Sequence, residues 1–143
     1  MTLTSSKRLL QIVVTALGLV PVSVGLYGVM FGPEFLRGTA VPAVDLDSHF
    51  RYLSGIFLGV GLMFYASLYE IEHKTLLFRL AAGLVVLGGV ARLASLLTIG
   101  LPSAGHLVGL GLELIVVPLL AYWQGRLAAA YRERAQLPFA QSK

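Results

Sequence analysis

Eight residues of the sequence, DLDSHFRY at Asp45 to Tyr52, hold four acidic or basic side chains and lead directly into a long apolar run. Two further charged residues, Arg92 and Glu113, lie inside other apolar runs. Carboxylate, imidazole and guanidinium groups bind polar ligands, transfer protons or hold metals, so these residues are the candidates for chemistry. What they do depends on the elements that position them.

The residue types argue against several kinds of chemistry. The chain has no cysteine, which excludes a thiol nucleophile and a disulfide framework. Its three histidines, His49, His73 and His106, are scattered without an H-x-x-x-H pattern, so no metal site is predicted. No nucleophile elbow, phosphate loop or dinucleotide fingerprint occurs, so neither catalytic residues nor cofactors are predicted. An enzyme would have to work from Asp, His and Arg side chains alone.

The composition is typical of a membrane protein. Of the 143 residues, 57% are hydrophobic and 13% charged, and the mean hydropathy is +0.81, whereas soluble domains have about 25% charged residues. The apolar blocks approach or exceed the roughly 20 residues that cross a bilayer as a helix. We therefore predict an all-α fold, an integral membrane four-helix bundle, in a single domain over residues 1–143. Its expected spans are about 9–31, 52–69, 76–100 and 105–123.

The orientation follows from the distribution of Lys and Arg near the span ends. Four crossings place eight basic residues on one side, namely Lys7, Arg8, Lys74, Arg79, Arg126, Arg132, Arg134 and Lys143, and only Arg37 and Arg51 on the other. Both termini and the solvated loop expected at 70–74 are then cytoplasmic, and DLDSHFRY faces outward. The basic rim suits the anionic surface of a lipid bilayer, and nothing indicates a nucleic-acid partner.

The two charges within apolar runs are predicted to form a pair. The third and fourth helices join at a turn near Pro102, and Arg92 and Glu113 lie about ten residues before and after it, which gives them matching depth. An unpaired charge at mid-bilayer costs about 2.5 to 3.5 kcal/mol on insertion scales, so pairing is favoured. The pair is either a structural clamp or a functional site.

Other polar residues are expected in the same outer half of the bundle. Asp47 or Ser48 is expected to cap the second helix, and Arg51 either pairs with Asp47 or competes for Glu113. Any cavity is expected to open outward near Arg51, with a dry inner half below it. The candidate ligand-binding residues are Arg51, Arg92, Glu113, His106, Tyr27, Asp47 and His49.

Several motifs together resemble one family of small bacterial membrane proteins. They are LDSHFRYLSG at 46–55, IEHKTLLFR at 71–79, GGVARLAS at 88–95, Pro102, and EL..VP at 113–118. In order and spacing they are similar to the family catalogued as domain of unknown function 4345, itself loosely similar to DoxX and DoxD proteins. The resemblance covers about Leu9 to Trp123. It implies four helices and a multi-pass protein of the bacterial cytoplasmic (inner) membrane, and it implies no activity.

Three functions remain open. The first is binding of a small polar or amphipathic ligand, such as a lipid or quinone headgroup, in an outward-facing pocket. The second is a structural or accessory subunit that docks on a larger membrane complex or on further copies of the chain. The third is a proton-coupled carrier that uses Glu113. Four helices without internal repeats count against a carrier, which usually needs paired halves.

Overall fold

The structure, a computed structural model, describes residues 2–35 and 43–140, and within these ranges it contains helices and no strand. In chain order its elements are α1 (Leu3–Phe31), the 3₁₀ turn η1 (Gly32–Phe35), α2 (Val44–Leu68), α3 (Thr75–Thr98), α4 (Ala104–Gly111), the π-helical turn η2 (Leu112–Val116) and α5 (Val117–Ala140). Because α4, η2 and α5 follow one another without a break, they form one long helical segment. The all-α prediction is confirmed.

Four helical segments in the described ranges are long and apolar enough to cross a membrane. They are Leu3–Glu34, Val44–Leu68, Thr75–Thr98 and Ala104–Gln136. All four begin before the predicted spans, most clearly the second, and the fourth also continues well past its predicted end. Hydropathy marks only the apolar part of a helix, whereas backbone hydrogen bonding continues through its polar ends.

The start of α2 corrects one prediction. The residue that precedes its first turn is Ala43, so neither Asp47 nor Ser48 is the N-cap. Asp47 lies inside the helix, in the first turn, where a carboxylate interacts favourably with the helix dipole.

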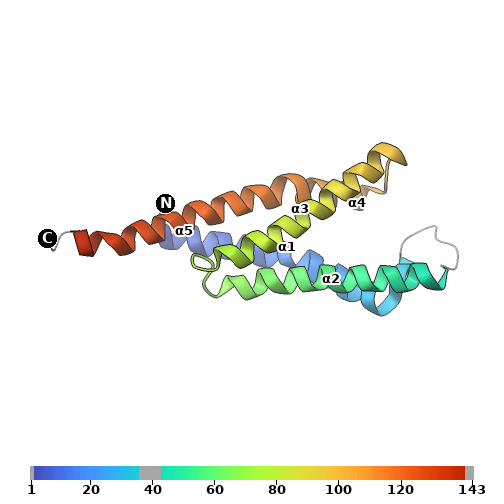
Figure 1. The fold of residues 1–143 in the computed structure, drawn as a ribbon, viewed down its shortest axis with the longest axis horizontal. Coiled ribbons are helices and arrows are strands. Elements are labelled where there is room, and N and C mark those ends of the chain that lie inside the picture. The colour runs from blue at the N-terminus through green and yellow to red at the C-terminus, as the bar shows by residue number, and fades with distance from the viewer. Residues whose placement is uncertain (1, 36–42, 141–143) are drawn as a thin grey trace.

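The helices are arranged as two antiparallel pairs, α1 with α2 and α3 with the α4–α5 segment (Figure 1). The pairs lie together at the end that holds the connection between α2 and α3. They diverge toward the opposite end, where α3 and α4 meet (Figure 1).

Glycines allow α1 and α2 to approach closely. A Cβ atom at Gly25 would lie 2.6 Å from the backbone nitrogen of Leu58, and one at Gly28 would collide with the side chain of Ser54. Small residues at such crossings let helices pack through their backbones, as is common in membrane helix pairs. The glycines therefore hold α1 and α2 together along much of their length.

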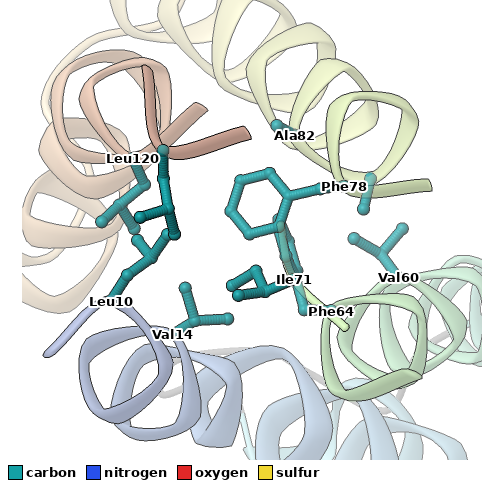
Figure 2. Close-up of a cluster of buried hydrophobic side chains, with 10 residues drawn as sticks. Leu10, Val14, Val60, Phe64, Ile71, Phe78, Ala82 and Leu120 are labelled. Carbon is teal, nitrogen blue, oxygen red and sulfur yellow. The ribbon is translucent and has the colours of Figure 1, made fainter. Parts of the chain in front are cut away.

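The hydrophobic core lies where the two pairs meet (Figure 2). Its buried members come from α1, α2, α3, α5 and the α2–α3 connection, and are Leu10, Val14, Val60, Phe64, Ile71, Phe78, Ala81, Ala82, Leu120 and Leu127. The rings of Phe64 and Phe78 meet edge to face with centroids 5.2 Å apart, a favourable aromatic geometry. This core fixes the closed end of the bundle, from which the two pairs diverge.

Candidate functional site

The ion pair predicted from matched depth is present. An Nη2 atom of Arg92 on α3 lies 3.3 Å from Oε1 of Glu113 in η2. Glu113 is only 8% exposed, whereas the side chain of Arg92 is 34% exposed. The carboxylate is thus the buried member, and the guanidinium lies nearer the surface.

Two glycines bring the helices of the pair close enough for this contact. A Cβ atom at Gly89 would lie 2.9 Å from Cβ of Glu113, and one at Gly109 would lie 2.9 Å from Nη1 of Arg92. A side chain at Gly89 would push α3 away from the fourth helical segment, and one at Gly109 would displace the guanidinium of Arg92. The small residues at positions 89 and 109 therefore allow the two charges to meet.

Glu113 lies in a π-helical turn, which the sequence analysis did not predict. Pro118 is the second residue after this turn, and it lacks the N–H that would bond to the carbonyl of Leu114 in an α-helix. A wider turn before such a proline redistributes the remaining hydrogen bonds. Single π-helical turns within α-helices occur frequently at functional sites.

A cavity of about 200 Å³ lies beside the ion pair, between α2 and α3. Its lining is Leu53, Ile56, Phe57, Val60, Leu84, Val85, Gly88, Arg92 and Glu113. A second cavity of about 70 Å³ lies among α1, α2 and the fourth helical segment, and it shares Phe57, Val85 and Glu113 with the first. Both linings are apolar except at the charged residues. Glu113 therefore borders both spaces.

One oxygen of Glu113 has no partner. Oε1 faces Arg92, but Oε2 is buried and accepts no hydrogen bond from the described residues. A buried acceptor without a hydrogen bond loses its hydration without compensation, so such atoms are rare in proteins. A ligand or water that donates to Oε2 would remove this cost.

Arg51 interacts away from this pair. Its Nε donates to Oδ2 of Asp47 at 2.8 Å, and its Nη1 donates to the backbone carbonyls of Val29 at 2.8 Å and Met30 at 2.9 Å. Two partners, Asp47 and Glu113, were left open for Arg51. It pairs with Asp47, in the first turn of α2. Arg51 thereby ties α2 to the last turn of α1, where helix carbonyls lack partners.

The cavity prediction is wrong in its position. Arg51 lines neither of the two cavities. Arg92 lines the larger one, and Glu113 lines both. The prediction fails because the helix pairs diverge, which separates the last turn of α1 and the start of α2 from α3.

We expect replacement of Arg51 by leucine to lower the unfolding temperature, because hydrogen bonds that involve a charged group contribute more to stability than neutral ones. The carbonyls of Val29 and Met30 would lose their donor. Thermal unfolding in mild detergent measures the change. His49→Leu is the control, since His49 is exposed on α2 two residues before Arg51. Equal unfolding temperatures for the two variants would contradict this role for Arg51.

Three further predicted residues lie outside both cavities. Tyr27 is exposed on α1 and packs against Phe31 with ring centroids 4.4 Å apart. His49 is exposed on α2. His106 forms a hydrogen bond of 2.9 Å between Nδ1 and Oγ of Ser103 at the start of α4. The seven predicted site residues therefore separate into the Arg92–Glu113 pair, the Arg51–Asp47 tie and these three.

A second buried polar cluster lies at the closed end, where a solvated loop was predicted. Glu72 is only 8% exposed and pairs with Lys7 of α1. Gln124 is fully buried and donates to the carbonyl of Ile71 at 2.7 Å and to Oγ1 of Thr75 at 3.0 Å. The sequence offered one signal for this cluster, which is the polar residue Gln124 at the end of an apolar run. The cluster fastens the α2–α3 connection to α1 and α5.

Glu72 predicts a pH dependence of stability. Burial opposes its ionisation, but hydrogen bonds from Lys7 and from its own backbone N–H outweigh burial and lower the pKa of Glu72 below its usual value. A depressed folded-state pKa contributes stability that is present above the unfolded-state pKa and lost as pH falls through the folded-state value. We therefore expect the unfolding temperature of the wild type to fall in acid more steeply than that of Glu72→Gln.

The matched control for this measurement is Glu70→Gln, because Glu70 is an exposed carboxylate two residues away. Its acid dependence is expected to follow the wild type. If Glu72→Gln also followed the wild type between neutral pH and about pH 3, Glu72 would not be the group responsible.

The fold defines a class before it defines a family: an all-helical protein with four helices long and apolar enough to cross a membrane, and a buried ion pair beside an apolar cavity. A family model described as "Domain of unknown function (DUF4345)" matches residues 9–124. The chain belongs to this family. No curated protein and no solved structure matches the chain.

Proposed function

We propose that the protein binds one small amphipathic molecule, such as a lipid or a quinone, in the cavity between α2 and α3. The observation that carries this proposal is the position of the buried Arg92–Glu113 pair at the edge of a largely apolar cavity of about 200 Å³. A polar headgroup would lie at the pair, and its apolar part would lie against the other lining residues. Ligand sites commonly combine an apolar lining with a few polar groups in this way.

The sides of the cavity support an amphipathic ligand over a fully polar one. Leu53 and Ile56 of α2 and Leu84 of α3 line it, yet they are 49%, 45% and 47% exposed. In a bilayer these half-exposed side chains would face acyl chains, so the cavity would open sideways to lipid. A ligand could then keep its apolar tail among the lipids while its headgroup reaches Glu113.

The experiment compares ligand retention by two leucine variants of α3. Gly88 lines the cavity and Gly83 does not, and a Cβ atom at either position would meet no atom within 4 Å. Gly88→Leu should fill the cavity without a clash, and Gly83→Leu adds the same side chain elsewhere. Each protein is purified in mild detergent, and small molecules extracted from it are quantified by mass spectrometry.

We expect the wild type and Gly83→Leu to retain the same amphipathic molecule, and Gly88→Leu to lose most of it. Equal retention by the two variants would place the molecule outside the cavity. Absence of any retained molecule from the wild type would contradict the proposal itself.

We further propose that the protein lies in the cytoplasmic membrane of a bacterium with both termini in the cytoplasm. The support is that eight Lys and Arg residues fall on one side and two on the other. Lys143 of the larger group and Arg37 of the smaller group lie outside the described residues. In this orientation the Arg92–Glu113 pair lies in the outer half of the bundle. The relationship to DoxX and DoxD proteins stays a prediction.

Cysteine labelling tests the orientation, because the chain has no cysteine of its own. A membrane-impermeant maleimide applied to intact cells should label Asp45→Cys and leave Ser5→Cys and Ala140→Cys unlabelled until the cells are lysed. Labelling of position 5 or 140 without position 45 would reverse the orientation.

An accessory role is a second candidate, and glycines on α2 favour it. Gly59 meets no atom within 4 Å and Gly55 meets only Val29 at 3.9 Å, so this small-residue face of α2 is open. Such faces suit close docking of another helix, from a larger membrane complex or another copy of the chain. Gly59→Ile should then reduce cross-linking through α2, and an unchanged cross-link would reject this face. The proton-coupled carrier stays a prediction.

A further inference from the structure

We infer that the headgroup bound at this site is an uncharged hydroxyl, held between Oε2 of Glu113 and the guanidinium of Arg92. The inference rests on the proposed function and names the chemical class of its ligand. The source of the hydroxyl can be a glycerolipid or another hydroxylated amphiphile, because the site recognises the group that they share. Charge balance, the unpartnered oxygen and the shape of the cavity each support it.

The charge balance of the cavity disfavours an ionic headgroup. Arg92 and Glu113 lie 3.3 Å apart and are the two charged side chains of its lining, with opposite signs. A phosphate would have to draw Arg92 away and leave the buried carboxylate alone, and an ammonium group would do the reverse. Separating one member of a buried pair is costly, so a neutral headgroup is favoured.

The unpartnered oxygen calls for a hydrogen-bond donor. Oε2 of Glu113 is buried and without a partner among the described residues, and an ionised carboxylate only accepts hydrogen bonds. A guanidinium only donates them. A hydroxyl does both: its O–H donates to Oε2 while its oxygen accepts from Arg92. An ether or ester oxygen can satisfy Arg92 but leaves Oε2 without a donor.

The cavity is suited to the part of such a molecule next to its hydroxyl. About 200 Å³ holds a small headgroup and the first atoms of its chains, and the remaining lining is apolar. The half-exposed residues Leu53 and Leu84 leave a way for the chains to continue outward into lipid. The site therefore selects by the headgroup.

Three probes with the same two oleoyl chains test this selection. They are 1,2-dioleoylglycerol, its 3-O-methyl ether and dioleoyl phosphatidic acid, each mixed at equal fractions into phosphatidylcholine nanodiscs that contain the full chain. Native mass spectrometry after release from the nanodiscs reports how much of each probe stays bound. We expect dioleoylglycerol to be retained about tenfold or more over either alternative, which corresponds to about 1.4 kcal/mol.

Two variants assign the preference to the site. In the double variant Arg92→Leu with Glu113→Leu, the cavity stays apolar but loses both polar groups, so dioleoylglycerol and its methyl ether should be retained equally. Gly88→Leu should retain none of the three, and Gly83→Leu should behave as the wild type.

The outcomes separate the inference from the proposed function. Equal or better retention of the methyl ether or the phosphatidic acid by the wild type, lost in Gly88→Leu, would overturn the hydroxyl inference and support the binding function. A hydroxyl preference that survives in the double leucine variant would also overturn the inference. Retention of all three probes that Gly88→Leu does not change, or no retention of any probe, would overturn both.

Discussion

Replacing Arg92 or Glu113 alone by leucine is expected to destabilise the protein more than replacing both. Removal of one member of a buried ion pair typically costs about 3 to 5 kcal/mol, because the remaining charge is left without a partner, whereas apolar replacement of both members is often neutral. The buried position of Glu113 makes Arg92→Leu the more damaging single change. Thermal unfolding in mild detergent of the wild type, both single variants and the double variant measures the effect.

The four proteins form a double-mutant cycle, which isolates the interaction between the two side chains. Additive effects of the two replacements would show that the 3.3 Å contact contributes no coupling. The cycle also separates the two roles left open for the pair. A double variant that folds and retains its ligand with the same headgroup preference identifies a structural clamp, and one that folds but loses the ligand or that preference identifies a functional site.

Gly25→Ala is expected to destabilise the α1–α2 pair by about 1 to 3 kcal/mol, the usual cost of added volume in a tightly packed contact. The new Cβ atom would lie 2.6 Å from the backbone nitrogen of Leu58 and 2.9 Å from its Cα atom. Backbone atoms cannot turn aside as a side chain can, so the helices would have to move apart. The fall in unfolding temperature is the measurement.

Gly83→Ala is the matched control for this change. It makes the same substitution within a helix, but its Cβ atom meets no atom within 4 Å. It should be neutral or slightly stabilising, because alanine favours the helix over glycine. A loss of stability equal to that of Gly25→Ala would mean that the close crossing of α1 and α2 does not determine the result.

These two predictions concern different parts of one arrangement. Gly25 holds α1 against α2, and the Arg92–Glu113 contact holds α3 against the fourth helical segment. The cavity lies between the pairs, and its width depends on how rigidly each pair is held. Ligand retention should therefore fall in Gly25→Ala as well, although Gly25 does not line the cavity.

The sequence by itself determined the features that follow from local patterns. Apolar runs of sufficient length predicted the helices, because hydropathy and backbone hydrogen bonding act within each segment. It also predicted the contact between Arg92 and Glu113. The short connection near Pro102 makes α3 and α4 antiparallel. Residues at equal distances from it along the chain therefore lie at the same depth.

Other features were decided only by the tertiary structure. Two partners, Asp47 and Glu113, were open for Arg51, and the divergence of the helix pairs leaves it with Asp47 and the last turn of α1. Glu72 was expected in solvent, but α1 brings Lys7 against it. Both outcomes depend on packing between residues far apart in the sequence, where glycines set the closeness of each crossing and the core sets the angle. No local pattern contains that information, because it arises only when the helices meet.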